Sequence, residues 1–361
     1  MLPKVNSLIP FHEIEEAAYS QIMNVINLDC LKTLAIMPDV HAGYDMCIGG
    51  VALLDGYISP SFIGYDLGCG MTFVNTEAKV EDVFDGDERL LFDDIYKAIP
   101  VGFSVREAPL DYEDFKSAGD FKDLDKRVAA RLHLSLGTLG GGNHFIEIGS
   151  NTDNEVCITI HSGSRNIGHS IGSKYMKLGR MFKIDSDLGK AYLEDMTFAL
   201  EFALANRLCM MKSVANLMGF RWTNKLKDTL INENHNHAIV TEDGILHRKG
   251  ATPADKDQLG VIPANMRDGV YVTKGLGNKE FLSSASHGAG RVYSRRKAKE
   301  EIPLELFEQT MKENNIIAKV ERSTLDESPF AYKDIDTVIG YQEGIVLNVI
   351  DKIKPIINIK A

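Results

Sequence analysis

The chain has 361 residues, of which 44% are hydrophobic and 25% are charged, a composition typical of a folded protein and not of a disordered one. Its formal net charge of −11 disfavours a protein that coats nucleic acid, so affinity for a polyanion would have to come from a local basic patch. No apolar run approaches the roughly 20 residues that span a bilayer, and the N-terminus lacks the regions of a signal peptide. We therefore expect a cytoplasmic protein.

The cysteines are scattered and form no CxxC pair, which argues against a disulfide framework and against a closed zinc knuckle. There are five: Cys30, Cys47, Cys69, Cys157 and Cys209. Any cysteine chemistry here would therefore use a single thiolate, as a metal ligand or as a nucleophile.

Three apolar runs have the length of strands, and each is followed by a glycine-containing, turn-rich loop. They are "LAIMP" from Leu34, "GMTFVNT" from Gly70 and "EVCITIHSGS" from Glu155. Polar residues that follow such strands are candidates for a site, because loops at strand ends carry most binding and catalytic groups.

Leucine, alanine and methionine at three- and four-residue spacing predict a long helix over Asp187 to Leu217. A second helix is predicted from about Asp334 toward Lys354, where Pro355 would end it. Because the strands are separated by unlike connections, the pattern predicts an α+β fold. We expect one mixed domain over residues 1–361, with β-sheets surrounded by helices.

Six loops rich in glycine or turn residues carry His, Asp, Cys or Asn. They read "MPDVHAGYDMCIGG", "GYDLGCG", "GTLGGGNHFIEI", "HSGSRNIGHS", "NENHNHAIV" and "SHGAGRVYSRR". This pattern predicts a single polar site that is built from strand ends and loops.

Candidate metal ligands lie on four of these loops. Asp66 and Cys69 could face one ion, although such a pair is more often a turn aspartate and a buried thiol. His144, His161 and His235 lie beside small or polar residues, and any one of them alone would more often be a core or surface histidine. Together the five suit one borderline divalent metal, or two that share the sulfur, and ligand softness alone favours zinc. Three histidines are left outside this predicted site: His169, His237 and His247.

Other loop residues suit an anionic or nucleotide ligand. Asn143 could donate to a phosphate oxygen, and Glu147 could accept from the N1–H and N2–H groups of guanine; the alternative is a strand with a solvated Glu147. Arg165, Arg291 and Arg295 have the fork shape that binds phosphate. For Arg165 the alternative is a structural salt bridge.

His287 precedes Gly-Ala-Gly and the densest positive charge of the chain. If Asp39 of "PDVH" accepts from one ring nitrogen of His287, the other nitrogen is free to attack phosphorus, while Gly288 and Gly290 leave room for a nucleotide. The alternative is a surface histidine at the start of a basic helix. The basic side chains that follow are Arg291, Arg295, Arg296, Lys297 and Lys299.

The chain resembles the RtcB family of RNA ligases from about Met37 to Ala361. Motifs that match this family in order and spacing are "MPDVH", "IGGVA", "GYDLGCG", "GTLGGGNHFIEI", "HSGSRNIGH", "HRKGATPA", "SSASHGAGRVYSR", "AYKDID" and "IKA". The resemblance implies the RtcB-type fold. It also implies an enzyme that uses GTP and manganese to join an RNA 3′-phosphate or 2′,3′-cyclic phosphate end to a 5′-hydroxyl end, in RNA repair or tRNA splicing.

The resemblance also implies roles for single residues. The nucleophile falls on His287, which would carry GMP as a phosphoramidate. Ligands for two Mn²⁺ ions fall on Asp66, Cys69, His144, His161 and His235, with the cysteine bridging, so manganese is implied where softness alone favours zinc. Nucleotide contacts fall on Asn143, His144, Phe145, Ile146, Glu147, His235, Asn236, Pro263, Ala264, Asn265, Met266, His287, Gly288, Ala289, Gly290 and Lys360.

One loop departs from the family pattern. It reads "IPANMRDGVYV", with Ala264, Asn265 and Val270 where the family typically has Gly, Ser and a further Ser, so its contacts to guanylate are expected to differ. An archease-type activator is a possible partner by the same resemblance. The alternative function is a metal-dependent phosphoesterase or cyclic phosphodiesterase that acts on RNA ends without nucleotidyl transfer. A non-catalytic RNA-binding remnant is disfavoured because Asp66, Cys69 and His287 are present.

Overall fold

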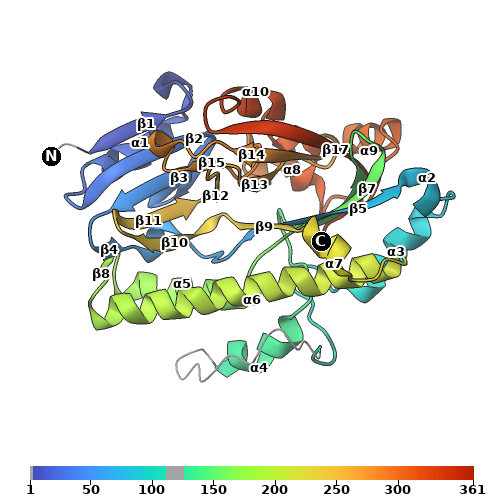
Figure 1. The fold of residues 1–361 in the computed structure, drawn as a ribbon, viewed down its shortest axis with the longest axis horizontal. Helices are drawn as coiled ribbons and strands as arrows, with labels where there is room; N and C mark the ends of the chain where they lie inside the picture. Colours follow the sequence, from blue (N-terminus) through green and yellow to red (C-terminus); the bar gives the residue numbers. More distant parts are fainter. Residues whose placement is uncertain (1–2, 111–125) are drawn as a thin grey trace.

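The computed structural model describes residues 3–110 and 126–361, and most of its strands belong to two sheets (Figure 1). The five-stranded sheet has the order β1 (Lys4–Ser7), β2 (Leu31–Tyr44), β3 (Met46–Leu54), β11 (Gly244–Lys249) and β10 (Asn236–Thr241). The eight-stranded sheet has the order β13 (Leu259–Pro263), β14 (Val270–Gly275), β17 (Leu347–Ile359), β6 (Phe145–Ser150), β7 (Glu155–Ser162), β5 (Gly70–Lys79) and β9 (Ile231–Asn234), with β16 (Ile317–Ala318) beside β17.

Two short strand pairs and the helices complete the fold. The pairs are β12 (Ala251–Pro253) with β15 (Ser284–Ser286), and β4 (Tyr57–Ile58) with β8 (Phe182–Lys183). The helices are α1 (Glu16–Ile26), α2 (Val80–Val83), α3 (Glu88–Ala98), α4 (Lys126–Ser135), α5 (Asn166–Leu178), α6 (Asp187–Leu217), α7 (Asn224–Asp228), α8 (Arg295–Glu301), α9 (Leu304–Glu313) and α10 (Ile335–Gly340). The α+β fold class predicted from the sequence is confirmed.

The long helix predicted over 187–217 is α6, which has these same bounds. The Ser186 hydroxyl accepts from the backbone N–H of Gly189 and caps its first turn. In Figure 1 the helix runs along one side of the strands, next to α5. Its apolar side packs on β7, and Met210, Met211 and Val214 join the core there. The three predicted strands are also confirmed, as β2, β5 and β7.

The helix predicted toward Lys354 is wrong beyond Gly340. Residues 335–340 form α10, whereas Leu347–Ile359 form β17. This segment is rich in β-branched residues, and β17 pairs with β14 along its first half and with β6 along its second half. Pro355 lies at a register irregularity, where its missing N–H is tolerated within a sheet.

The two faces of β6 and β7 have different roles, because successive side chains of a strand point to opposite sides. Ile146 and Ile148 point into the core that the sheet shares with α3 and α6. Phe145, Glu147 and His161 alternate with such core residues along their strands and lie on the opposite face. That face carries the polar site described below.

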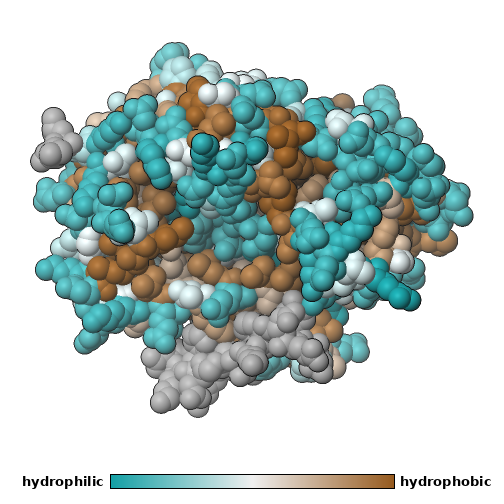
Figure 2. Space-filling model, in the orientation of Figure 1, coloured by the Kyte–Doolittle hydropathy of each residue, from teal (hydrophilic) through white to brown (hydrophobic). Residues whose placement is uncertain are grey.

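The surface drawn in Figure 2 is mostly hydrophilic, with hydrophobic residues between the polar ones. Among residues 3–110 and 126–361, no helix combines the length and the apolar composition that a bilayer crossing requires.

Candidate active site

The ends of four neighbouring strands of the eight-stranded sheet bring the candidate ligands together. Cys69 directly precedes β5 and His144 directly precedes β6, whereas His161 lies near the end of β7 and His235 directly follows β9. Since neighbouring strands here are antiparallel, the starts of β5 and β6 meet the ends of β7 and β9. At His235 the chain leaves the large sheet and enters β10 of the five-stranded sheet. The site therefore lies where the two sheets meet.

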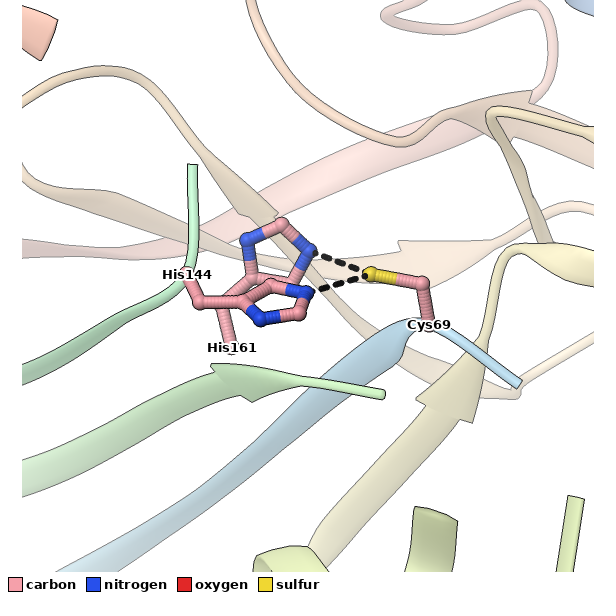
Figure 3. Close-up of side chains that lie close together, drawn as sticks. All are labelled: Cys69, His144 and His161. Atoms are coloured by element: carbon pink, nitrogen blue, oxygen red, sulfur yellow. Dashed lines mark hydrogen bonds between the residues drawn. The ribbon is translucent and has the colours of Figure 1, made fainter. Parts of the chain in front are cut away.

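The five candidate metal ligands form a row of neighbouring atoms. The Nε2 of His144 lies 3.3 Å from the Asp66 carboxylate and 3.3 Å from the Cys69 sulfur. The same sulfur lies 3.2 Å from the Nε2 of His161, which is 3.4 Å from the Nε2 of His235. Figure 3 shows the rings of His144, from the loop before β6, and His161, from β7, pointing at the thiol. The structure thus brings all five predicted ligands together, with the sulfur in the middle.

These groups suit a divalent cation. Ligand atoms bound about 2.0–2.3 Å from a four-coordinate ion lie about 3.5 Å apart, close to the spacings within the row. Burial lowers the pKa of His161 and of His235 well below the ordinary value, so both rings are neutral, which is the form that binds metals. Loss of hydration alone would raise the pKa of Asp66, but the neighbouring His144 ring lowers it to about 2. This carboxylate is therefore ionised at neutral pH.

Backbone groups fix the orientation of two of the candidate ligand rings. The Nδ1 of His161 lies 3.1 Å from the backbone oxygen of Asn143, which fixes the ring with Nε2 toward the sulfur. Gly140 has a φ of +94°, and a Cβ there would lie 2.6 Å from the Nδ1 of His144. A side chain at this position would displace the ring, so glycine is required.

His287 follows β15 and lies beside this row. Its Nδ1 is 2.6 Å from the buried carboxylate of Asp39, which also accepts from the His287 backbone N–H at 3.2 Å. The ring centroid is 4.9 Å from that of His235. Gly290 has a φ of +76°, and a Cβ there would lie 2.5 Å from the Asp39 backbone oxygen. This close contact of the two loops keeps Asp39 against His287.

A cavity of about 640 Å³ opens onto His287 and the candidate ligands. Most residues predicted to contact a nucleotide line it: Asn143, Phe145, Glu147, His235, Asn236, Pro263, Ala264, Asn265, Met266, His287, Gly288, Ala289, Gly290 and Lys360. Two do not. The His144 side chain lies in the row of ligands, and Ile146 points into the core on the other side of the sheet. Asn265 uses its side chain within its own loop, where it bonds to Asp268 and to the backbone of Arg267.

The cavity wall includes two buried hydrogen-bond acceptors that have no partner among the described residues. Glu147 and Asn358 are each 2% exposed and lie opposite each other on β6 and β17. The Asn358 amide donates to Glu147 Oε2 at 2.9 Å, whereas Glu147 Oε1 and Asn358 Oδ1 have no hydrogen-bond partner among the described residues. Burial raises the pKa of Glu147 to about 8. Lys360, two residues after Asn358, also lines the cavity.

The three predicted phosphate-binding arginines are engaged in the structure. Arg165 donates to the Thr138 hydroxyl and to the backbone oxygen of Gly102, and it pairs with no carboxylate of the described residues. Arg291 and Arg295 both pair with the buried carboxylate of Glu327. Arg295 remains 46% exposed and lines the cavity, so it is the more accessible of the two.

The buried carboxylate of Glu327 pairs with Arg291, Arg295 and Lys360. Burial alone would raise its pKa, but Lys360 and Arg295 lower it to about 2. The Lys360 ammonium lies 2.9 Å from Glu327 and 3.4 Å from the Asn143 backbone oxygen. The position of Lys360 is therefore set before any ligand binds.

Two residues of this site, Asn358 and Arg207, were not predicted from the sequence. Asn358 interrupts the otherwise apolar "PIINI" run of β17, and Arg207 interrupts the apolar side of α6. The fully buried guanidinium of Arg207 donates to the backbone oxygens of Gly68, at 2.9 Å, and Ser162, at 3.0 Å, next to two of the ligands. A polar residue at a core position of a periodic segment was the available signal in both cases.

The three histidines left outside the predicted site have other contacts. His169 stacks on Tyr65, His237 lies 3.3 Å from Arg248, and His247 accepts from the backbone N–H of Ser59.

Comparisons with known proteins agree with the motifs. The sequence model of the family described as tRNA-splicing ligase RtcB matches residues 21–119 and 107–361. An RNA-splicing ligase RtcB of Escherichia coli strain K12 is 32% identical over 391 residues, which cover 96% of this chain and 95% of that protein. Two archaeal tRNA-splicing ligases RtcB, from Nanoarchaeum equitans and Methanococcus maripaludis, are 30% and 28% identical, each over 96% of this chain and 92% of its own length.

Proposed function

Since this chain belongs to the RtcB family and is an RNA ligase, we propose that it joins RNA ends by carrying GMP on His287. The substrates would be an RNA end with a 3′-phosphate or 2′,3′-cyclic phosphate and an RNA end with a 5′-hydroxyl, and GTP would supply the GMP. RNA repair and tRNA splicing both need such a reaction.

The chemistry requires activation of the phosphate, because a phosphate monoester is a poor electrophile and a 5′-hydroxyl is a weak nucleophile. In the first step the free nitrogen of His287 attacks the α-phosphorus of GTP and pyrophosphate leaves. An oxygen of the RNA 3′-phosphate, which water would first have to release from a 2′,3′-cyclic phosphate end by opening the ring, then attacks the GMP phosphorus and releases the histidine. In the last step the 5′-hydroxyl attacks the activated 3′-phosphate, and GMP leaves.

The contact between His287 and Asp39 is the observation on which this proposal chiefly rests. At 2.6 Å the Asp39 carboxylate would accept a hydrogen bond from Nδ1–H of His287. The lone pair of the ring would then be on Nε2. The ring thus has the tautomer and the orientation of a nucleophile before the nucleotide binds. Asp39 would also stabilise the positive charge that develops on the ring during attack.

The metals of the proposal are two Mn²⁺ ions. The Cys69 sulfur contacts His144, whose ring also contacts Asp66, and it contacts His161, whose ring also contacts His235, so these residues could hold two ions that share the thiolate. Bound there, the ions would reduce the negative charge of the triphosphate that a neutral nucleophile approaches.

Two buried acceptors in the cavity wall support guanine as the base. Guanine presents N1–H and N2–H donors side by side, with the O6 acceptor next to them. Glu147 Oε1 and Asn358 Oδ1 would accept from the two donors, and Lys360 would donate to O6. Adenine presents the opposite pattern at the corresponding positions, so it would leave these buried groups unpaired.

Incubation with α-labelled GTP tests nucleophile, nucleotide and cation together. We expect a label on the protein that is stable to alkali and labile to acid, that is strongest with Mn²⁺ in a panel of divalent metals, and that is absent in His287→Ala. A protein that never becomes labelled, and whose His287→Ala variant opens a 2′,3′-cyclic phosphate as fast as the parent, would instead be a metal-dependent phosphodiesterase.

A further inference from the structure

An aromatic cluster lies at the rim of the cavity. We call Tyr44, Tyr65 and His169 the aromatic rim. The ring centroids of Tyr44 and Tyr65 are 6.2 Å apart with the planes at 51°, and Tyr65 stacks on His169 at 5.0 Å and 23°. Both tyrosines line the cavity that contains His287, and Tyr65 directly precedes the candidate ligand Asp66.

The tyrosines of the aromatic rim are exposed, although their rings pack against each other. Tyr44 is 57% exposed and Tyr65 is 41% exposed. Because His169 covers one face of the Tyr65 ring, Tyr44 is the more accessible of the two tyrosines. The 6.2 Å separation leaves no room for a base between the two tyrosines. A flat ligand would therefore stack on the outer face of Tyr44.

The backbone that carries Tyr44 is fixed on several sides. Tyr44 ends β2, Met46 begins β3, and Asp45 between them has a φ of +66° and pairs with Arg180 at 2.7 Å. The preceding Gly43 exchanges two hydrogen bonds with the side chain of Gln21, at 2.8 and 3.0 Å.

A buried lysine adds to this support. Lys249 donates to the backbone oxygen of Tyr44 and, at 3.0 Å, to that of Ser61. An exposed ring on a backbone held in this way is ordered before a ligand arrives, which lowers the entropic cost of binding.

We propose that the aromatic rim is a stacking platform for one unpaired base of the RNA, next to the end that reacts. This inference rests on the RNA-ligase function, which requires RNA ends to enter the cavity that these rings border. Stacking on an aromatic ring is the usual way to hold a single-stranded base whatever its identity. That mode suits a ligase that accepts different RNA ends.

The experiment compares Tyr44→Ala and Tyr65→Ala with the parent in ligation of two short single-stranded RNAs. Steady-state KM is measured separately for the 3′-phosphate strand and for the 5′-hydroxyl strand. We expect Tyr44→Ala to raise KM for one of the two strands by about tenfold or more, and Tyr65→Ala to raise it less. Tyr44→Phe keeps the ring and should behave like the parent. Tyr19→Ala is the matched control, because Tyr19 is also 41% exposed but lies on α1 outside the cavity.

Substrates with one abasic nucleotide at successive positions then identify the stacked base. At that position, an abasic nucleotide should raise the KM of the parent about as much as Tyr44→Ala raises it with the intact RNA. The abasic nucleotide should not raise the KM of Tyr44→Ala further. Equal abasic penalties in the parent and in Tyr44→Ala at every position would overturn the proposal.

The covalent labelling step separates this inference from the proposed function, because it needs GTP and metal but no RNA. Tyr44→Ala should label His287 at the parental rate and with the parental KM for GTP. A raised KM for GTP in this variant would show that Tyr44 contacts the nucleotide instead of RNA, and would also overturn the proposal. If neither protein becomes labelled, the failure lies in the proposed GMP transfer and not in the aromatic rim.

Discussion

Two groups of residues around the cavity differ in whether their polar atoms already have partners. At the metal end, which we define as Asp66, Cys69, His144, His161 and His235, the candidate ligand atoms already contact one another. At the base end, defined as Glu147, Asn358 and Lys360, two buried acceptors have no partner among the described residues.

The difference follows from what each end would bind. A cation needs ligands close to one point, so its site can be preassembled from neutral imidazoles and a thiol that hydrogen-bond to one another. A base brings its own donors, so its site must leave acceptors unpaired. Buried unpaired acceptors are costly, and this cost is recovered only when a ligand with matching donors enters.

The largest expected effect is that of Cys69→Ala, which would break the metal end alone. We expect Mn²⁺ affinity to fall more than 100-fold and labelling by GTP to slow on the order of 10³-fold, because the two ions would share this sulfur. Binding of guanosine, which has no phosphate, should stay at the parental level. Calorimetry with Mn²⁺ and with guanosine checks both statements. Cys157→Ala, at a buried cysteine in the core of the same sheet, is the control and should change neither.

A smaller effect is expected for Asp39→Asn, which acts on His287 between the two ends. Loss of the charge next to Nδ1 should slow labelling about 100-fold, because the developing imidazolium is less stabilised. Affinities for Mn²⁺ and for guanosine should both stay within about twofold of the parent. A parental labelling rate in this variant would show that Asp39 serves the fold and not the nucleophile.

The affinity of the base end for guanosine should depend on pH because Glu147 ionises near neutral pH. With a pKa of about 8, Glu147 is mostly protonated in the empty pocket at pH 7 and mostly ionised at pH 9. Since the ionised form would accept from guanine, which loses its own N1 proton only in more alkaline solution, affinity for guanosine should rise by about tenfold or more from pH 6.5 to pH 8. Glu147→Gln should remove this rise. A flat profile in the parent protein would contradict the assignment.

The smallest effect tests Asn358 by comparing GTP with inosine triphosphate, which lacks only the 2-amino group. The parent should prefer GTP by about fivefold in the labelling reaction, and Asn358→Leu should lose that preference. Asn265→Ala is the control, because Asn265 lines the cavity but bonds within its own loop, so the preference should persist. An unchanged preference in Asn358→Leu would remove this residue from base recognition.

The sequence was more informative about the metal end than about the base end. Asp66, Cys69, His144, His161 and His235 stand out because they are ligand-type residues in or beside loops rich in glycine or turn residues. Asn358 has no such neighbours, and its role depends on β17 lying beside β6, a contact between residues 211 positions apart. The sequence predicted a helix toward Lys354 that Pro355 would end, so neither the strand that carries Asn358 nor its pairing with β6 was foreseen.

The state of the arginines was also beyond sequence reasoning. Arg291 and Arg295 are fork-shaped phosphate ligands by type, but Glu327 reaches both from a segment more than 30 residues away. Charge compensation of this kind depends on tertiary placement, which the composition of one loop does not contain. The long helix α6, by contrast, was predicted with its bounds because its periodicity is local.

The passage of the chain from one sheet to the other at His235 has a consequence for thermal behaviour. Four of the ligands belong to strand ends of the large sheet or to its loops, and His235 is the residue at which the five-stranded sheet is joined to it. A cation held by His235 and its neighbours would cross-link the two sheets at their junction. Chelation should then lower the melting temperature of both sheets together, and reloading with metal should restore one shared transition.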